Sequence, residues 1–275
     1  MRFLILGLII FSVTPSFATA DDANTFIHPS MERNHVLLLG SFRQRSDAQI
    51  NTSSSSRSLG FDLQNLGLRK SDTNIAINYR YRLTERLNLT LAYSDYIDRG
   101  SRSLNSQVDF NDTIYDVGVT VESEFRTRNL STRLVYDYYQ SPTTTLGIGL
   151  GIHALELKAS IAGSGRINDT TSPTYIRETD SLLAPLPNIM LTATHAFNSR
   201  LLVSGSAGWL SANIDPYDGE TRFIEGMIEY RVSDHFSLAA AYQLIDLNVD
   251  HRGRLLNSQY SIQQGGPMLL VKWSF

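Results

Sequence analysis

Apolar and polar residues alternate one by one along much of this chain. The clearest example is residues 73–83, in which Ile75 and Ile77 share one face and polar residues occupy the other. A spacing of two places successive side chains on opposite faces of a β-strand. A tight turn at residues 84–86 leads into residues 87–94, which alternate in the same way and complete a predicted hairpin.

The same pattern recurs and predicts ten strands. They cover residues 35–45, 73–83, 87–94, 129–140, 145–160, 186–197, 201–213, 222–232, 236–249 and a last stretch that ends at residue 275. Polar loops are predicted at residues 46–72, 98–128, 162–181 and 250–261. Because proline cannot donate to a ladder, Pro185 and Pro187 are expected at the start of a strand, near the rim.

Short turns and long loops follow one another between these strands, so the two ends of the sheet are expected to differ. An even number of antiparallel strands can close on itself and leave no edge. The prediction is an all-β, transmembrane, antiparallel up-and-down β-barrel over residues 35–275, with about ten strands and with eight or twelve as alternatives. A soluble β-sandwich also alternates, but its strands are usually shorter and its connections need not alternate in length.

The last residues of the chain carry a more specific pattern. The residues of its apolar phase are Leu269, Val271, Trp273 and Phe275. This stretch resembles the last strand of bacterial outer-membrane β-barrels, and the architecture is similar to small barrels of the OmpA, OmpX and OmpW type. The resemblance implies a Gram-negative outer-membrane protein whose terminal residues are read by the barrel-assembly machinery.

The amino end is consistent with export. Arg2 precedes an apolar run at residues 3–13, and an A-x-A site follows at residues 18–20. The run is too short for a transmembrane helix, which needs about twenty residues, and it has the form of a signal peptide. We expect cleavage after Ala20, which makes residues 1–20 the signal peptide and leaves residues 21–34 as a periplasmic segment before the barrel.

Composition narrows the classes of molecule that this protein is expected to bind. The net charge of −3 is too mild to favour nucleic acid as a partner, and the chain has no cysteine for disulfide or thiolate chemistry. A mean hydropathy of −0.16 does not exclude a membrane barrel, because half of each strand faces a polar lumen. We expect a monomer in contact with outer-membrane lipid and lipopolysaccharide, with no cofactor and no metal.

Charged residues recur on the phase that faces the lumen. They are Arg80, Arg82, Arg133, Asp137, Glu225, Glu229, Arg231 and Lys272. Two interpretations remain open. In one, ion pairs fill a narrow barrel and plug it, and in the other the charges line a small channel.

The expected function is therefore an integral outer-membrane barrel of structural type, or a narrow, porin-like pore for small solutes. The alternative is a ligand-binding or adhesion protein that acts through its long outer loops. Barrels host many roles, so the fold alone does not choose between them.

Two enzyme patterns were weighed, and no enzyme is expected. A His-x-Ser motif of outer-membrane lipid hydrolases occurs at residues 28–30, which are expected to lie outside the barrel wall. Omptin proteases place acidic pairs and an Asp-x-His element at the outer rim, and Asp95, Asp98 and the adjacent pair Asp250 and His251 depart from that spacing. A lone inward His153 is expected to be a hydrogen-bonded wall residue.

Overall fold

A computed structural model describes residues 26–275, except for residues 55–56, 63–66, 69–70, 111–112, 168–173, 215–216 and 253–256. The predicted signal peptide lies outside the described residues. The described chain consists almost entirely of strands, joined to one turn of 3₁₀-helix, η1 (Pro29–Met31). No helix in this part of the chain is long and apolar enough to cross a membrane.

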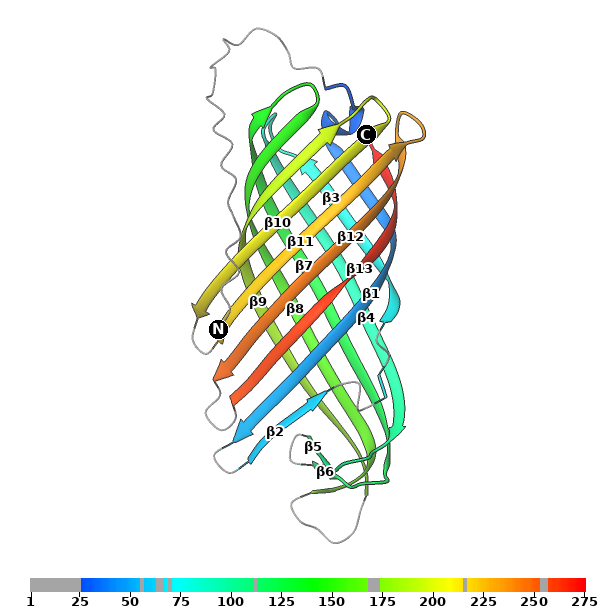
Figure 1. The fold of residues 1–275 in the computed structure, drawn as a ribbon, viewed down its shortest axis with the longest axis vertical. Helices are drawn as coiled ribbons and strands as arrows, with labels where there is room; N and C mark the ends of the chain where they lie inside the picture. Colours follow the sequence, from blue (N-terminus) through cyan, green and yellow to red (C-terminus); the bar gives the residue numbers. More distant parts are fainter. Residues whose placement is uncertain are drawn as a thin grey trace.

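Ten long antiparallel strands form the wall of a closed barrel (Figure 1), as predicted. They are β1 (His35–Ser54), β3 (Ser71–Arg82), β4 (Leu87–Ser103), β7 (Thr120–Gln140), β8 (Thr144–Ile167), β9 (Thr174–Ala196), β10 (Leu201–Ile214), β11 (Tyr217–Arg231), β12 (Phe236–Arg252) and β13 (Asn257–Ser274). Each of these strands pairs with the one that follows it in the list, and β1 pairs with β13 to close the barrel. The short strands β2 (Arg57–Asp62), β5 (Val108–Phe110) and β6 (Thr113–Tyr115) lie outside this ring.

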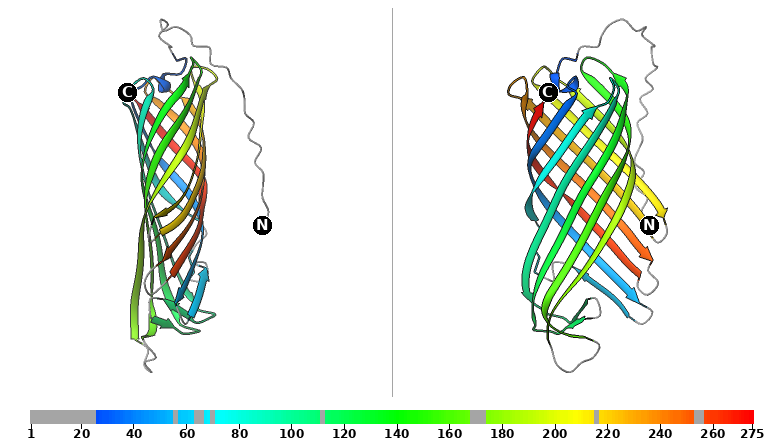
Figure 2. Two further views of the ribbon diagram at one scale, coloured as in Figure 1. Left: turned by 90° about the vertical axis from the view of Figure 1, so that its left-hand side faces the viewer. Right: turned by 180° about the vertical axis from the view of Figure 1, so that it is seen from behind.

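The two ends of the barrel differ. At one end, which we call the turn end, short turns connect β3 to β4, β7 to β8, β9 to β10 and β11 to β12. The start of β1 and the chain terminus also lie there, where the His35 amide donates to the Phe275 carbonyl at 3.0 Å. At the opposite loop end the β8 and β9 hairpin extends beyond its neighbours (Figure 2).

Alternation sorts the side chains between the two faces of the wall. The inner face combines polar and small residues with several buried apolar ones, whereas the outer wall exposes a belt of large apolar side chains. Members of the belt include Ile77, Leu91, Leu134, Ile148, Leu150, Ile152, Ile189, Leu191, Ile228 and Leu238. A continuous apolar belt on a closed barrel is typical of a surface that faces hydrocarbon.

The strands are longer than the alternation predicted. β1 runs to Ser54, β4 to Ser103 and β8 to Ile167, so much of the expected loops at residues 46–72, 98–128 and 162–181 is strand. The expected loop at residues 250–261 likewise shortens to the turn between β12 and β13. Beyond the apolar belt both faces of a strand carry polar residues, so the contrast on which the prediction depended is lost.

The predicted position of the two prolines was wrong. Pro185 and Pro187 lie inside β9, where they pair with Ala154 and Ile152 of β8. On its other side β9 pairs with β10 only as far as Ile189, which is opposite Trp209. The prolines therefore occupy a stretch with a strand partner on one side, where a missing N–H is tolerated.

Candidate functional site in the barrel lumen

A buried ion pair lies in the lumen near the turn end. Lys272 Nζ is 2.5 Å from Glu229 Oε2, and the two side chains are 5% and 0% exposed. Ser30 in η1 donates its hydroxyl to Glu229 Oε1 at 2.7 Å. β11, β13 and the segment before β1 thus meet at one carboxylate.

Two arginines of β3 hold the same segment from the opposite wall. Arg80 donates to the Ser30 carbonyl at 2.6 Å, and Arg82 donates to the carbonyls of Glu32 and Glu85 at 3.1 and 2.8 Å. Guanidinium donors satisfy carbonyls that the short helical turn leaves free. Residues 26–34, which we call the cap, are therefore fastened by charged side chains of two strands, β3 and β11.

Apolar contacts complete the attachment of the cap. Phe26 and Met31 pack with Ala196 and Leu202 at the β9–β10 turn, and all four side chains are buried. The Ile27 amide donates to the Pro142 carbonyl at 2.9 Å. The cap therefore lies across the turn end of the lumen.

His28 and Ser30 belong to this cap, which precedes β1 and is not part of the barrel wall, as expected. Both side chains are buried. His28 Nδ1 accepts from the Ser30 amide at 3.3 Å, whereas the Ser30 hydroxyl is directed to Glu229. The two side chains are not arranged as a base and a nucleophile, which would need a hydrogen bond between the imidazole and the hydroxyl.

The remaining predicted lumen charges do not join this group. Arg133 and Glu225 approach each other at 3.9 Å halfway along the barrel. Asp137 accepts from Asn88 at 2.9 Å, and Arg231 pairs with Asp234 in an exposed turn at 3.4 Å. The structure thus separates the predicted set into a cap group, a mid-barrel pair and two local contacts.

Two small cavities lie between the mid-barrel pair and the loop end, with volumes of about 80 and 50 Å³. They share a lining of Phe42, Ser94, Asn129, His153, Phe223 and Gln243. On the inner face of β8, Gly151 makes room for Asn188, because a Cβ at Gly151 would lie 2.8 Å from Asn188 Oδ1.

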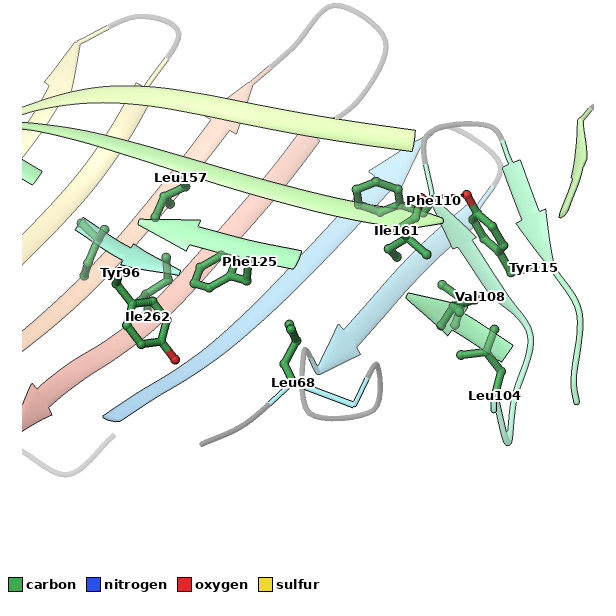
Figure 3. Close-up of a cluster of buried hydrophobic side chains, with 12 residues drawn as sticks. Leu68, Tyr96, Leu104, Val108, Phe110, Tyr115, Phe125, Leu157, Ile161 and Ile262 are labelled. Carbon is green, nitrogen blue, oxygen red and sulfur yellow. Dashed lines mark hydrogen bonds between the residues drawn. The ribbon is translucent and has the colours of Figure 1, made fainter. Parts of the chain in front are cut away.

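An apolar layer fills the lumen at the loop end (Figure 3). The cluster joins Tyr96 of β4 and Phe125 of β7 to Leu247 and Ile262 of β12 and β13, across the lumen. Other members include Leu68, Leu104, Val108, Phe110, Tyr115 and Ile161. Gln264 also reaches across the barrel and donates to Thr127 at 3.3 Å.

Tyr115 of β6 anchors this layer. Its side chain is fully buried, and its hydroxyl donates to the Ile161 carbonyl of β8 at 3.2 Å. Burial raises the pKa of Tyr115 to about 12, and the nearby Glu178 acts in the same direction. The hydroxyl therefore stays protonated and keeps its role as a donor at neutral pH.

Solved structures share this architecture. The outer-membrane protease OmpT from Escherichia coli aligns with a TM-score of 0.56 and 9% identity, over 88% of this chain and 97% of that one. The chain has the fold of an outer-membrane β-barrel. No family model matches the sequence, and neither does any curated protein.

Other outer-membrane barrels align less closely. The toluene transporter TodX from Pseudomonas putida gives a TM-score of 0.36 at 8% identity, over 91% of this chain and 93% of that one. The attachment invasion locus protein Ail from Yersinia pestis gives 0.29 at 10% identity, over 85% and 97%. Since even the OmpT likeness concerns the fold alone, roles must be argued from the residues of this barrel.

The acidic residues that were compared with the omptin pattern are not arranged as a catalytic pair. Asp95 accepts a bidentate contact from Arg126, and Arg128 lies 3.8 Å away. Asp98 is buried. The side chains of Asp250 and His251 lie outside the described part of the chain, so no geometry links them to Asp95.

The C-terminal residues of this outer-membrane-type barrel lie on its outer wall. Leu269, Val271, Trp273 and Phe275 are all exposed, on the phase opposite the buried Lys272. Trp273 stacks on Phe236 with ring centroids 6.3 Å apart, and Phe275 stacks on His35 at 5.0 Å. The terminus thus forms an aromatic edge at the turn end.

No pattern in the sequence indicates Ser30 or Asn88 as partners of the lumen charges. Ser30 lies before the first alternating stretch, where no periodicity indicates a direction. Asn88 is on the predicted inner face of β4, but its partner Asp137 became evident only when β4 was placed beside β7.

The cap should respond to pH through His28. Burial lowers the pKa of His28 below 6.5, and the nearby Glu229 opposes this shift without cancelling it. The docked cap therefore favours neutral histidine, so its stability is full above pH 6.5 and falls as the pH drops below 6.5 towards the docked pKa.

We expect limited proteolysis of the cap in purified protein to accelerate between pH 7.5 and pH 5.5. A His28→Asn variant, which cannot titrate, should lose most of this dependence. Equal acceleration in both proteins would show that another group controls docking.

Proposed function

We propose that this protein is an integral outer-membrane β-barrel of structural type, with a lumen that is closed to ions at rest. One observation carries the proposal: the lumen is obstructed in succession by the cap with its Glu229–Lys272 pair, by the Arg133–Glu225 pair and by the apolar layer at the loop end. A narrow solute pore would need these obstructions to move.

The outer wall supports the membrane part of this proposal. The apolar belt would face hydrocarbon, and the turn end, with the cap and the aromatic terminus, would face the periplasm. Lipid and lipopolysaccharide would then be the surrounding partners, and a monomer suffices because the ten-stranded wall is already closed. No catalytic role is assigned.

Cell fractionation and liposome swelling test this function. The protein should fractionate with the outer membrane and migrate differently on gels before and after boiling, because a closed barrel resists detergent unfolding. Liposomes that contain it should not swell faster in small sugars than empty liposomes. A soluble periplasmic protein would refute the membrane part, and rapid swelling would refute the closed state.

A second candidate is ligand binding or adhesion at the loop end. The observation in its favour is that β7, β8 and β9 continue beyond the apolar belt as a tall wall that carries charged residues such as Glu122 and Arg177. Removing the tip of this wall should abolish binding to cells or matrix if the candidate is right, and it should leave barrel stability unchanged.

Assembly should depend on the terminal aromatic residues. We propose that Leu269, Val271, Trp273 and Phe275 are the stretch that the assembly machinery reads. Changing both Trp273 and Phe275 to Ser should lower the yield of folded, heat-modifiable protein in the outer membrane at least fivefold. As a control, Tyr138→Ser and Tyr139→Ser remove aromatic residues from the same end of the barrel and should preserve the yield. Equal yields for both variants would show that the terminal pattern has no such role.

A further inference from the structure

The barrel wall has a seam between β9 and β10. Both strands continue towards the loop end, β10 to Ile214 and β9 from Thr174, yet their described ladder ends at the pair Ile189 and Trp209. If this register continued, Pro187 and Pro185 would be the next residues of β9 on the same face as Ile189. Since neither can donate an N–H, the sequence itself ends the ladder there.

Unsatisfied polar atoms lie directly inside this seam. Asn188 pairs with Gly151 and His153 pairs with Leu186, so both side chains belong to the inner face at the level of the prolines. Asn188 is 2% exposed. Within the described chain, its two amide atoms and His153 Nε2 have no hydrogen-bond partner. A native barrel seldom leaves such atoms buried and unpaired unless a molecule supplies the partner.

The lumen has space beside His153 and beside Asn129, whose Oδ1 likewise has no hydrogen-bond partner within the described chain. The 50 Å³ cavity is lined by His153, Leu155, Leu186 and Phe223, and the 80 Å³ cavity continues on the other side of the shared lining. A single water needs only about 10–15 Å³, and an apolar cavity of about 150 Å³ holds a benzene ring. Each cavity alone is too small for a benzene ring, but the two together approach that volume, so one ring would occupy both and displace the waters that they can hold.

The chemistry of the lining selects the kind of molecule. Phe42, Phe223, Leu155 and Leu186 offer an apolar surface, whereas His153, Asn129 and Gln243 offer hydrogen bonds. The nearest charges, Arg133 and Glu225, are paired with each other, so the cavity carries no net charge. A charged ligand would lose its hydration without gaining a partner.

The seam starts where the apolar belt ends. The outward residues Ile152 and Ile189 adjoin the seam on the side of the belt. Further along β8, Ala154 pairs with Pro185, and the next outward residue is Glu156, which pairs with Leu183. Unpaired backbone groups would therefore lie at the membrane interface, because hydrocarbon does not tolerate them. An opening there is compatible with a lumen that is closed along its axis.

We propose that the mid-lumen cavity binds a small neutral molecule with an apolar ring and a single hydroxyl group, and that this molecule enters sideways through the β9–β10 seam. The hydroxyl pairs with His153 or Asn129, and the ring lies against Phe223 and Leu186. This inference goes beyond the proposed function, since it concerns a binding site and not conductance along the barrel axis.

Phenol is a suitable probe, and its binding can be followed by calorimetry and by saturation-transfer NMR on the full-length mature barrel in lipid nanodiscs. Wild-type protein should bind one phenol per barrel. A variant with His153→Leu and Asn129→Leu should bind at least tenfold more weakly. His195→Leu, an exposed histidine of β9 far from the cavity, is the matched control and should bind as the wild type does.

The route of entry needs a separate variant. Changing both Pro185 and Pro187 to Val restores two N–H donors and allows the ladder to extend. Phenol association should then slow at least tenfold, while the equilibrium affinity stays within about threefold. Thermal stability, measured in parallel, shows whether each variant is folded.

Three results would overturn the inference. If saturable binding to the wild type is absent, the cavity holds water and the site does not exist. If affinity is unchanged in the folded His153 and Asn129 variant, phenol binds elsewhere. If association is unchanged in the folded proline variant, the seam is not the route.

Discussion

Replacing Glu229 by Ala is expected to lower the free energy of unfolding by about 3–5 kcal/mol, the usual cost of breaking a buried ion pair from one side. The substitution leaves Lys272 buried without its partner, which lies 2.5 Å away in the wild type, and it removes the acceptor of the Ser30 hydroxyl. Urea unfolding in lipid vesicles measures the change.

An exposed pair on the same strand provides the control. Glu220 contacts Arg222 at 2.5 Å, but the side chains are 34% and 64% exposed, so Glu220→Ala should cost no more than about 1 kcal/mol. A second comparison replaces Glu229 by Leu together with Lys272 by Met, which removes both charges and should recover most of the loss. Equal costs for Glu229→Ala and Glu220→Ala would contradict the buried pair.

An arginine at Leu150 is expected to destabilise the barrel by about 2–4 kcal/mol, the cost of a cation near the middle of the lipid-facing wall. Leu150 points outward from β8 and lies between Leu134 and Ile189 in the apolar belt. Reversible unfolding in vesicles, compared with the wild type, gives the difference.

Val117 provides a matched control for this substitution. Its exposure of 64% is nearly the same as the 63% of Leu150, but it lies in the segment between β6 and β7 at the loop end. Val117→Arg should change the free energy of unfolding by less than about 0.5 kcal/mol, as ordinary surface substitutions do. If Leu150→Arg were equally mild, the belt would not face hydrocarbon.

The faces of the strands could be predicted because lumen and lipid impose opposite polarity on adjacent residues. Ile77, Leu134 and Lys272 all lie on the predicted face. Their agreement tests the assignment, because a register shift of one residue would have reversed every one of them. The number of strands followed from counting these stretches between turns.

Other features left no periodic signal. The cap has no alternation, and its direction is decided by contacts between Ser30 and residues far along the chain, at β3 and β11. Pro185 and Pro187 were placed at a strand start because sequence alone does not show that β9 is paired on one side only at that level. The apolar layer likewise joins residues of strands on opposite walls, a proximity that only barrel closure creates.

The two ends of the lumen are closed by different kinds of side chain. Near the turn end, charged side chains are satisfied by one another and by the carbonyls of the cap. Near the loop end, apolar side chains from opposite walls exclude water, and Tyr115 anchors them through a single hydroxyl. Charged groups left open in such a narrow space would be costly, so each predicted charge needs either a partner or water.

Planar-bilayer conductance of the purified mature protein tests the closed lumen most directly. A deletion of residues 21–34 removes the cap, Arg133→Ala with Glu225→Ala removes the mid-barrel pair, and Leu247→Ala with Ile262→Ala opens the apolar layer. A variant that combines all three changes serves as the positive control. The wild type should insert without a stable conductance step, and the combined variant should give steps of defined size. A wild-type protein that conducts steadily in uniform steps would contradict a barrel that is closed at rest.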